Sequence, residues 1–164
     1  DGVMAEGSAT LLEVQTLGER GLKYRHRLGG GLSNWIHLGA VRAPRLADTC
    51  GSGDWCTAGL IAKAAAGGQA GIRHAGPSGV EAALRYGQAL AAWNCGFEGA
   101  RGGMYIVERD AFEAQISRLL RGEIESLTDT PVMVESTQPI ACPACPPMPS
   151  KPRALKGLRP ERAA

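Results

Sequence analysis

The chain has 164 residues, and its 18 basic and 16 acidic side chains give a formal net charge of +2 at pH 7. Hydrophobic residues make up 44% of it and aromatic residues only 5%, while its 23 glycines are about twice the usual proportion of roughly 7%. The ordinary apolar content excludes wholesale disorder, and the glycines lack the three-residue period of collagen. The balanced charge argues against nucleic acid as a partner. No apolar run is long enough to predict a membrane span.

The first third of the chain predicts three short strands. Residues 11–17 (LLEVQTL) and 22–28 (LKYRHRL) are expected to pair as a hairpin across the turn at 18–21. Three glycines at 29–31 break this pattern, and residues 35–41 (WIHLGAV) predict a further strand.

Three helices are predicted after the strands. The first begins at residue 53 or 54 and ends at 66, because a glycine pair follows it. The second is expected over 79–95, where Ser78 and Glu81 have the spacing of a capping box. The third is expected over 110–121. Strands followed by helices indicate an α/β domain, and its helix faces need more sheet than this segment supplies.

The helical and strand patterns decay after residue 128. We therefore expect one domain over residues 1–128 and a proline-rich, flexible tail over 129–164, in which residues 131–136 could form a short strand. The pair Cys142 and Cys145 lies in this tail. It is either half of a zinc site completed by another chain or, as we expect, a pair of reduced thiols. Five cysteines in all do not suggest a disulfide framework, which favours the cytoplasm.

The segment 48–54 (DTCGSGD), directly before a predicted helix, is the strongest indication of chemistry. Its glycines allow close approach of the backbone to a ligand, and the first helical turn offers unpaired N–H groups to an anion such as phosphate. A carboxylate at Asp54 has a purpose there if it takes a proton from an attacking hydroxyl. The alternative is a helix N-terminus that is only structural. A P-loop is excluded because its lysine motif is absent, and Cys56 replaces the third glycine of a dinucleotide fingerprint.

Four segments in order resemble the PfkB, or ribokinase-like, family of carbohydrate kinases. Residues 48–59 (DTCGSGDWCTAG) resemble its C-terminal signature, and residues 16–21 (TLGERG) resemble its nucleotide-contacting turn. Residues 81–89 (EAALRYGQA) resemble the helix that borders the adenine, and residues 99–100 resemble its last glycine loop. The order and spacing of the four segments agree with the family pattern over roughly residues 10–105.

The resemblance implies the C-terminal portion of a ribokinase-like three-layer α/β fold, with ATP and Mg²⁺ as cofactors and a small sugar or sugar-like alcohol as substrate. It implies that Asp54 is the general base. The implied anion hole is formed by the backbone of Gly51, Ser52 and Gly53. The implied nucleotide-binding residues are Thr16, Gly18, Glu19, Gly21, Gly53 and Gln88. Homodimers are an expected assembly for this family.

Some members of the family also bind a monovalent cation. By that analogy K⁺ would be surrounded by the Asp48 carboxylate and by the carbonyl groups of Cys50, Asn94, Phe97 and Gly99. The alternative is that Asp48 only hydrogen-bonds its own loop.

The chain departs from the family pattern in ways that bear on its function. Trp55 is large where the family has a small residue, and it would either reshape the acceptor pocket or pack on a neighbouring subunit. Cys50, Ser52 and Gln88 also differ from the usual residues. The family's substrate-recognition residues and the acidic residue that organises magnesium lie in an N-terminal half that this sequence does not include. The alternative function is therefore a non-catalytic nucleotide-binding or regulatory protein derived from a sugar kinase.

Overall fold

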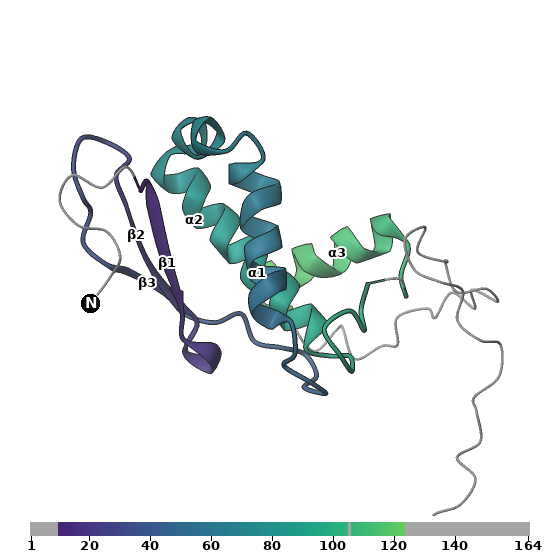
Figure 1. Ribbon diagram of the computed structural model, residues 1–164. Helices are drawn as coiled ribbons and strands as arrows, with labels where there is room; N and C mark the ends of the chain where they lie inside the picture. Colours follow the sequence, from purple (N-terminus) through teal and green to yellow (C-terminus); the bar gives the residue numbers. More distant parts are fainter. Residues whose placement is uncertain (1–9, 105, 124–164) are drawn as a thin grey trace, which may run out of the picture.

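The computed structural model describes residues 10–104 and 106–123, which form a mixed α/β fold. Its sheet has three strands in the order β1 (Leu12–Thr16), β2 (Leu22–His26) and β3 (Ile36–Leu38), and both neighbouring pairs are antiparallel. Helices cover one side of this sheet (Figure 1). The three predicted strands are confirmed, although the third is shorter than the predicted range of 35–41.

The alternation of side chains in β2 gives the sheet two different faces. Leu22 and Tyr24 are each 1% exposed and pack with Val80 and Leu84 of the helical layer. On the opposite face, the register places Glu13 beside Arg25, and their side chains form an ion pair of 2.9 Å. This alternation is the period-two pattern from which the strands were predicted.

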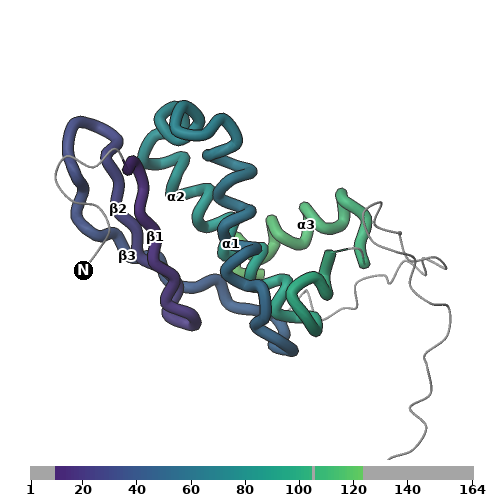
Figure 2. Tube along the Cα trace, in the orientation of Figure 1, coloured from purple at the N-terminus to yellow at the C-terminus, as the bar shows by residue number. Residues whose placement is uncertain are grey.

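Two long helices run in opposite directions against the sheet (Figure 2). Helix α1 (Ser52–Leu60) continues into one π-helical turn, η2 (Ile61–Ala65), and helix α2 covers Gln69–Asn94. The predicted first helix is thus confirmed, with a change of helix type near its end. The two helices cross closely at Gly59 and Gly87. A Cβ atom on Gly59 would lie only 2.5 Å from the Cα atom of Gly87, so both positions require glycine.

Helix α2 contains a break that the sequence predicted only in part. Gly76 has φ 64° and ψ −176°, which are not helical, and Pro77 starts the longer second portion. The predicted helix over 79–95 corresponds to that portion, whereas the helical residues 69–75 before the break were not predicted. The predicted capping box is wrong, because Ser78 lies inside the helix, and the Glu81 carboxylate instead accepts hydrogen bonds from Tyr24 and Arg85.

Helix α3 (Arg109–Leu120) confirms the predicted third helix. Gly122, with φ 77°, ends it, since the N–H of Gly122 donates to the Leu119 carbonyl and the N–H of Glu123 donates to the Arg118 carbonyl, both at 3.0 Å. This is the Schellman arrangement that glycine favours. Ile116 and Leu119 pack in a second core cluster with the end of α2.

The described residues include no helix that is both long enough and apolar enough to cross a membrane. The tail at 129–164, the strand predicted at 131–136 and the Cys142–Cys145 pair lie outside the described residues.

Candidate functional site

The candidate site is centred on the N-terminus of α1, where the backbone turns sharply at Gly51. Gly51 has φ 75° and ψ 0°, a left-handed conformation that L side chains rarely adopt. A Cβ atom there would also lie 2.8 Å from both the Cα and Cβ atoms of Ala100. The first glycine of the GSGD segment is therefore required both by its dihedral angles and by the loop packed against it.

The first turn of α1 presents backbone donors to solvent. The N–H of Ser52 donates to the Thr49 carbonyl at 3.2 Å. Within the described part of the chain, no acceptor is bonded to the N–H groups of Gly53 or Asp54, and both residues are exposed. Such donors, together with the positive end of the helix dipole, favour an anion at this place.

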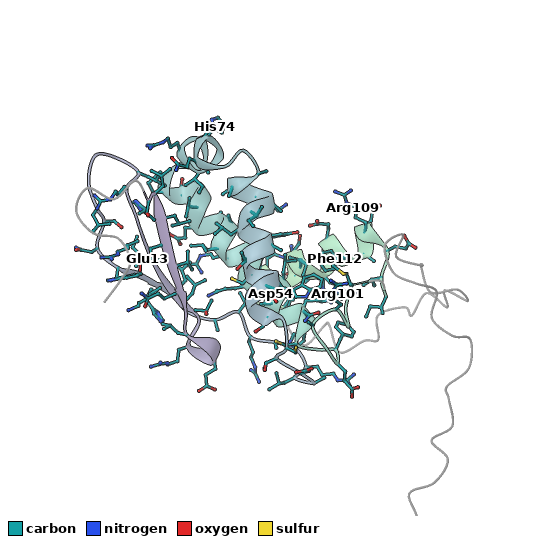
Figure 3. The ribbon with its side chains drawn as sticks, viewed as in Figure 1. Glu13, Asp54, His74, Arg101, Arg109 and Phe112 are labelled. Atoms are coloured by element: carbon teal, nitrogen blue, oxygen red, sulfur yellow. The ribbon has the colours of Figure 1, made fainter. Side chains whose placement is uncertain are left out.

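The Asp54 side chain belongs to the same exposed turn. Among the residues that the structure describes, its carboxylate has no hydrogen-bond or ion-pair partner. Figure 3 places it at the lower end of α1. In this arrangement the unpaired carboxylate can accept a proton, and the unpaired N–H groups beside it can stabilise negative charge.

The Asp48 carboxylate ties this turn to the loop that follows α2. One oxygen, Oδ1, accepts a hydrogen bond from the N–H of Cys50, and Oδ2 accepts one from the N–H of Gly99, each at 2.9 Å. These backbone hydrogen bonds lower the pKa of Asp48 below its ordinary value. Asp48 thus hydrogen-bonds its own loop at Cys50, as expected in the alternative to cation binding. It also hydrogen-bonds Gly99 in the loop after α2.

Asn94 and Cys95, at the end of α2, hold the same segment from behind. The Cys95 carbonyl accepts hydrogen bonds from the N–H groups of Ala47 and Asp48, at 2.7 and 3.2 Å. The Asn94 side chain is fully buried, and its Nδ2 donates to the Cys50 carbonyl at 3.3 Å. Its Oδ1 has no hydrogen-bond partner among the described residues. A buried oxygen without a donor is a suitable neighbour for a cation.

Trp55 fills the space between α1, α2 and α3. Its indole Nε1 donates to the Ala100 carbonyl at 2.8 Å, and its ring lies 6.1 Å from that of Trp93 and 6.5 Å from that of Phe112. Trp55 therefore packs inside this chain, and it links Asp54 to the loop at Ala100. This hydrogen bond was not predicted, and its one signal in the sequence was a residue that is unusually large for the family pattern.

A hollow of about 300 Å³ joins the α1 turn to strand β1. Thr16 and Gly53, both expected at the nucleotide site, line it together, although they are far apart in sequence. Sequence reasoning did not identify its other lining residues, which are Val14, Cys56, Thr57, Leu60 and Leu84. Four of these residues are apolar like ordinary core residues, and Thr57 is an exposed helix residue, so no sequence signal marked them as a group.

The remaining expected nucleotide residues lie in the turn after β1 and on helix α2. Residues Gly18–Arg20 form one 3₁₀ turn, in which Glu19 is exposed. Gly21 has φ 89°, and a side chain there would collide with the Leu38 carbonyl. Gln88 is only 7% exposed, and its Nε2 lies 3.5 Å from the same carbonyl oxygen. Gly21 and Gln88 thus meet at the end of β3.

Phe97 completes the set of expected site residues. Its ring packs at a tilt of 55° against Trp93 with 4.8 Å between ring centroids, and its N–H donates to the Asn94 carbonyl at 3.0 Å. The described residues contain no group of three or more His, Cys, Asp or Glu side chains that could hold a metal ion. Comparisons with protein-family models, curated proteins and solved structures found no match to this chain.

Proposed function

We propose that this chain is the nucleotide-binding, C-terminal portion of a ribokinase-like (PfkB) carbohydrate kinase, which transfers a phosphoryl group from ATP to a hydroxyl of a sugar or sugar-like substrate. The observation that carries the proposal is the exposed, unpaired Asp54 carboxylate in the same helical turn as the unpaired N–H groups of Gly53 and Asp54. The four-segment resemblance supports the choice of family.

The roles of the residues follow from the chemistry of phosphoryl transfer. The substrate hydroxyl gives its proton to Asp54, its oxygen forms a bond to the γ-phosphorus, and the bond from that phosphorus to the β–γ bridging oxygen breaks and leaves ADP. The N–H groups at the start of α1 stabilise the negative charge on the transferring group. The hollow between Thr16 and Gly53 lies beside this turn and offers room for part of the nucleotide.

The described residues fit the two proposed metal ions, Mg²⁺ and K⁺, to different degrees. The described residues contain no cluster of carboxylates that fits Mg²⁺, which would be held by the phosphate oxygens of ATP. The residues around the α1 turn fit a monovalent cation better, because the buried Asn94 Oδ1 lacks a donor. Asp48 and the carbonyl groups of Cys50, Asn94, Phe97 and Gly99 would hold K⁺ there, and its charge would support the anion site.

The described cysteines are consistent with the proposed cytoplasmic location. Cys50, Cys56 and Cys95 are all free thiols. A reducing compartment would keep them so.

The test is the turnover of the complete protein with Mg-ATP and a panel of sugars, measured as ADP release. The substitution Asp54→Asn should lower turnover by about 10²-fold or more, because it removes the base, while ATP binding is retained. Asp110→Asn is the matched control, since Asp110 is an exposed aspartate in the first turn of α3. Wild-type turnover in the Asp54→Asn variant would overturn the assignment of the base.

The same assay separates the alternative function. If the complete protein binds ATP but phosphorylates no member of the panel, the non-catalytic nucleotide-binding reading replaces the kinase. If it neither binds ATP nor turns over, both readings fail.

A further inference from the structure

A second and larger hollow, of about 560 Å³, lies between the β2–β3 loop and the break in α2. The described residues that line it are Arg27, Leu28, Gly29, Gly30, Gly31, Arg73, Gly76 and Pro77. Figure 3 shows His74, the neighbour of Arg73, at the upper corner of the helical pair and Asp54 at the opposite end of α1. This hollow is therefore separate from the candidate kinase site.

The charge of the hollow is one-sided. Two arginine residues, Arg27 and Arg73, line it, and none of its described lining residues is acidic. Arg73 is exposed and forms no ion pair or hydrogen bond with another described residue. Guanidinium groups bind phosphate and carboxylate oxygens with paired, charge-assisted hydrogen bonds, so the lining favours an anion.

The glycines of the hollow leave it open. A Cβ atom added to Gly29, Gly30, Gly31 or Gly76 would meet nothing within 4 Å, so packing does not require these glycines. The loop that carries the first three is nevertheless closed at its base, because the N–H of Ser33 donates to the His26 carbonyl at 2.9 Å. The space in front of the two arginines is thus accessible and bounded by a loop that is closed at its base.

We infer that this hollow is a binding site for a small phosphate monoester whose organic group is apolar. The arginines would hold the phosphate, and Leu28 and Pro77 supply an apolar wall for the organic group. An inorganic phosphate ion would use only the first of these features. A monoester such as phenyl phosphate should consequently bind more tightly than inorganic phosphate does.

Isothermal titration calorimetry of the full chain with phenyl phosphate and with inorganic phosphate tests the inference. We expect one phenyl phosphate per chain, at least tenfold tighter than inorganic phosphate. Arg73→Gln should weaken phenyl phosphate at least tenfold. Gly31→Leu should also abolish binding, because Gly31 lacks a positive φ and its side chain would enter open space. Arg101→Gln, an exposed arginine outside the hollow, should bind as the wild type does.

The variant Gly53→Asp distinguishes binding in the hollow from binding at the anion site of α1. It places a carboxylate in the first turn of α1 and leaves the hollow untouched. Loss of phenyl phosphate binding in this variant, with wild-type affinity in both hollow variants, would overturn the inference. Absence of any saturable binding to the wild-type chain would overturn it too. The first of these results would place the anion at the α1 turn and leave the proposed kinase function standing, and ATP binding is measured in a separate assay, so the two proposals fail separately.

Discussion

The Asp48 carboxylate accepts a hydrogen bond from the N–H of Gly99 at 2.9 Å, which joins two loops that are 51 residues apart in the sequence. With its other oxygen Asp48 fixes the N–H of Cys50, directly before the α1 turn. One ionised side chain thus contributes directly to the position of the candidate anion site relative to the loop after α2.

Stability should therefore depend on the charge of Asp48 at low pH. Its pKa is lowered in the folded state, so the stabilisation is present above the unfolded value of about 3.9 and is lost as the pH falls through the folded pKa. Thermal unfolding of the wild type and of Asp48→Asn between pH 2 and pH 6 measures this contribution. The difference between the two should be largest above pH 4 and shrink below it. A difference that is independent of pH would contradict this role.

The indole hydrogen bond of Trp55 should contribute measurably to stability. Trp55→Phe keeps an aromatic ring but removes the donor to the Ala100 carbonyl, at an expected cost of about 0.5–1.5 kcal/mol in the free energy of unfolding. Trp35→Phe is the control, because Trp35 lies under Lys23 and Arg25 on the outer face of the sheet, and a phenyl ring retains that contact. Chemical denaturation measures both. Equal losses in the two variants would show that the indole hydrogen bond contributes nothing particular.

The crossing of α1 and α2 should not tolerate a methyl group. In Gly87→Ala the new Cβ atom would collide with the Cys56 carbonyl, so we expect a loss of about 1–3 kcal/mol in the free energy of unfolding. Gly53→Ala is the control, since a Cβ atom there meets nothing within 4 Å, and its stability should stay level or rise by up to about 1 kcal/mol. If Gly87→Ala unfolds at the wild-type denaturant concentration, the close crossing does not exist in solution.

The three described thiols should differ in their reaction with iodoacetamide. Cys50 is exposed, whereas Cys56 and Cys95 are buried, and burial raises the pKa of both of these thiols. Cys50 should be alkylated faster, by on the order of tenfold or more, as followed by peptide mass spectrometry. Bound ATP at the α1 turn should slow the reaction of Cys50 alone. Equal rates at all three thiols would contradict the exposure of Cys50. No protection of Cys50 by ATP would contradict ATP binding at the α1 turn.

The local elements could be predicted from the sequence because their signals are local. The alternation in residues 12–16 and 22–26 predicts the hairpin, and Gly122 predicts the end of α3. The helical residues 69–75 before Gly76 were missed, because a segment that contains Gly71 and is followed by Gly76 and Pro77 lacks intrinsic helix propensity. This segment packs closely on η2, where a Cβ atom on Gly71 would lie 2.8 Å from the Ala64 carbonyl oxygen.

The site could be predicted in its chemistry but not in its connections. The motif at 48–54 indicated a helix N-terminus with an exposed carboxylate, which the fold contains. The hydrogen bonds from Asp48 to Gly99 and from Trp55 to Ala100 join distant segments, and no sequence period or spacing encodes them. The hollow shared by Thr16 and Gly53 likewise results from the packing of β1 against α1.

The most direct test of the central proposal, that the α1 turn binds the phosphates of a nucleotide, is a titration of ¹⁵N-labelled protein with ATP followed by backbone amide chemical shifts. We predict saturable shifts at Gly53 and Asp54, accompanied by Thr16 across the hollow, with one binding constant for all three. Absence of saturable shifts at Gly53 and Asp54, or shifts confined to another part of the chain, would contradict it.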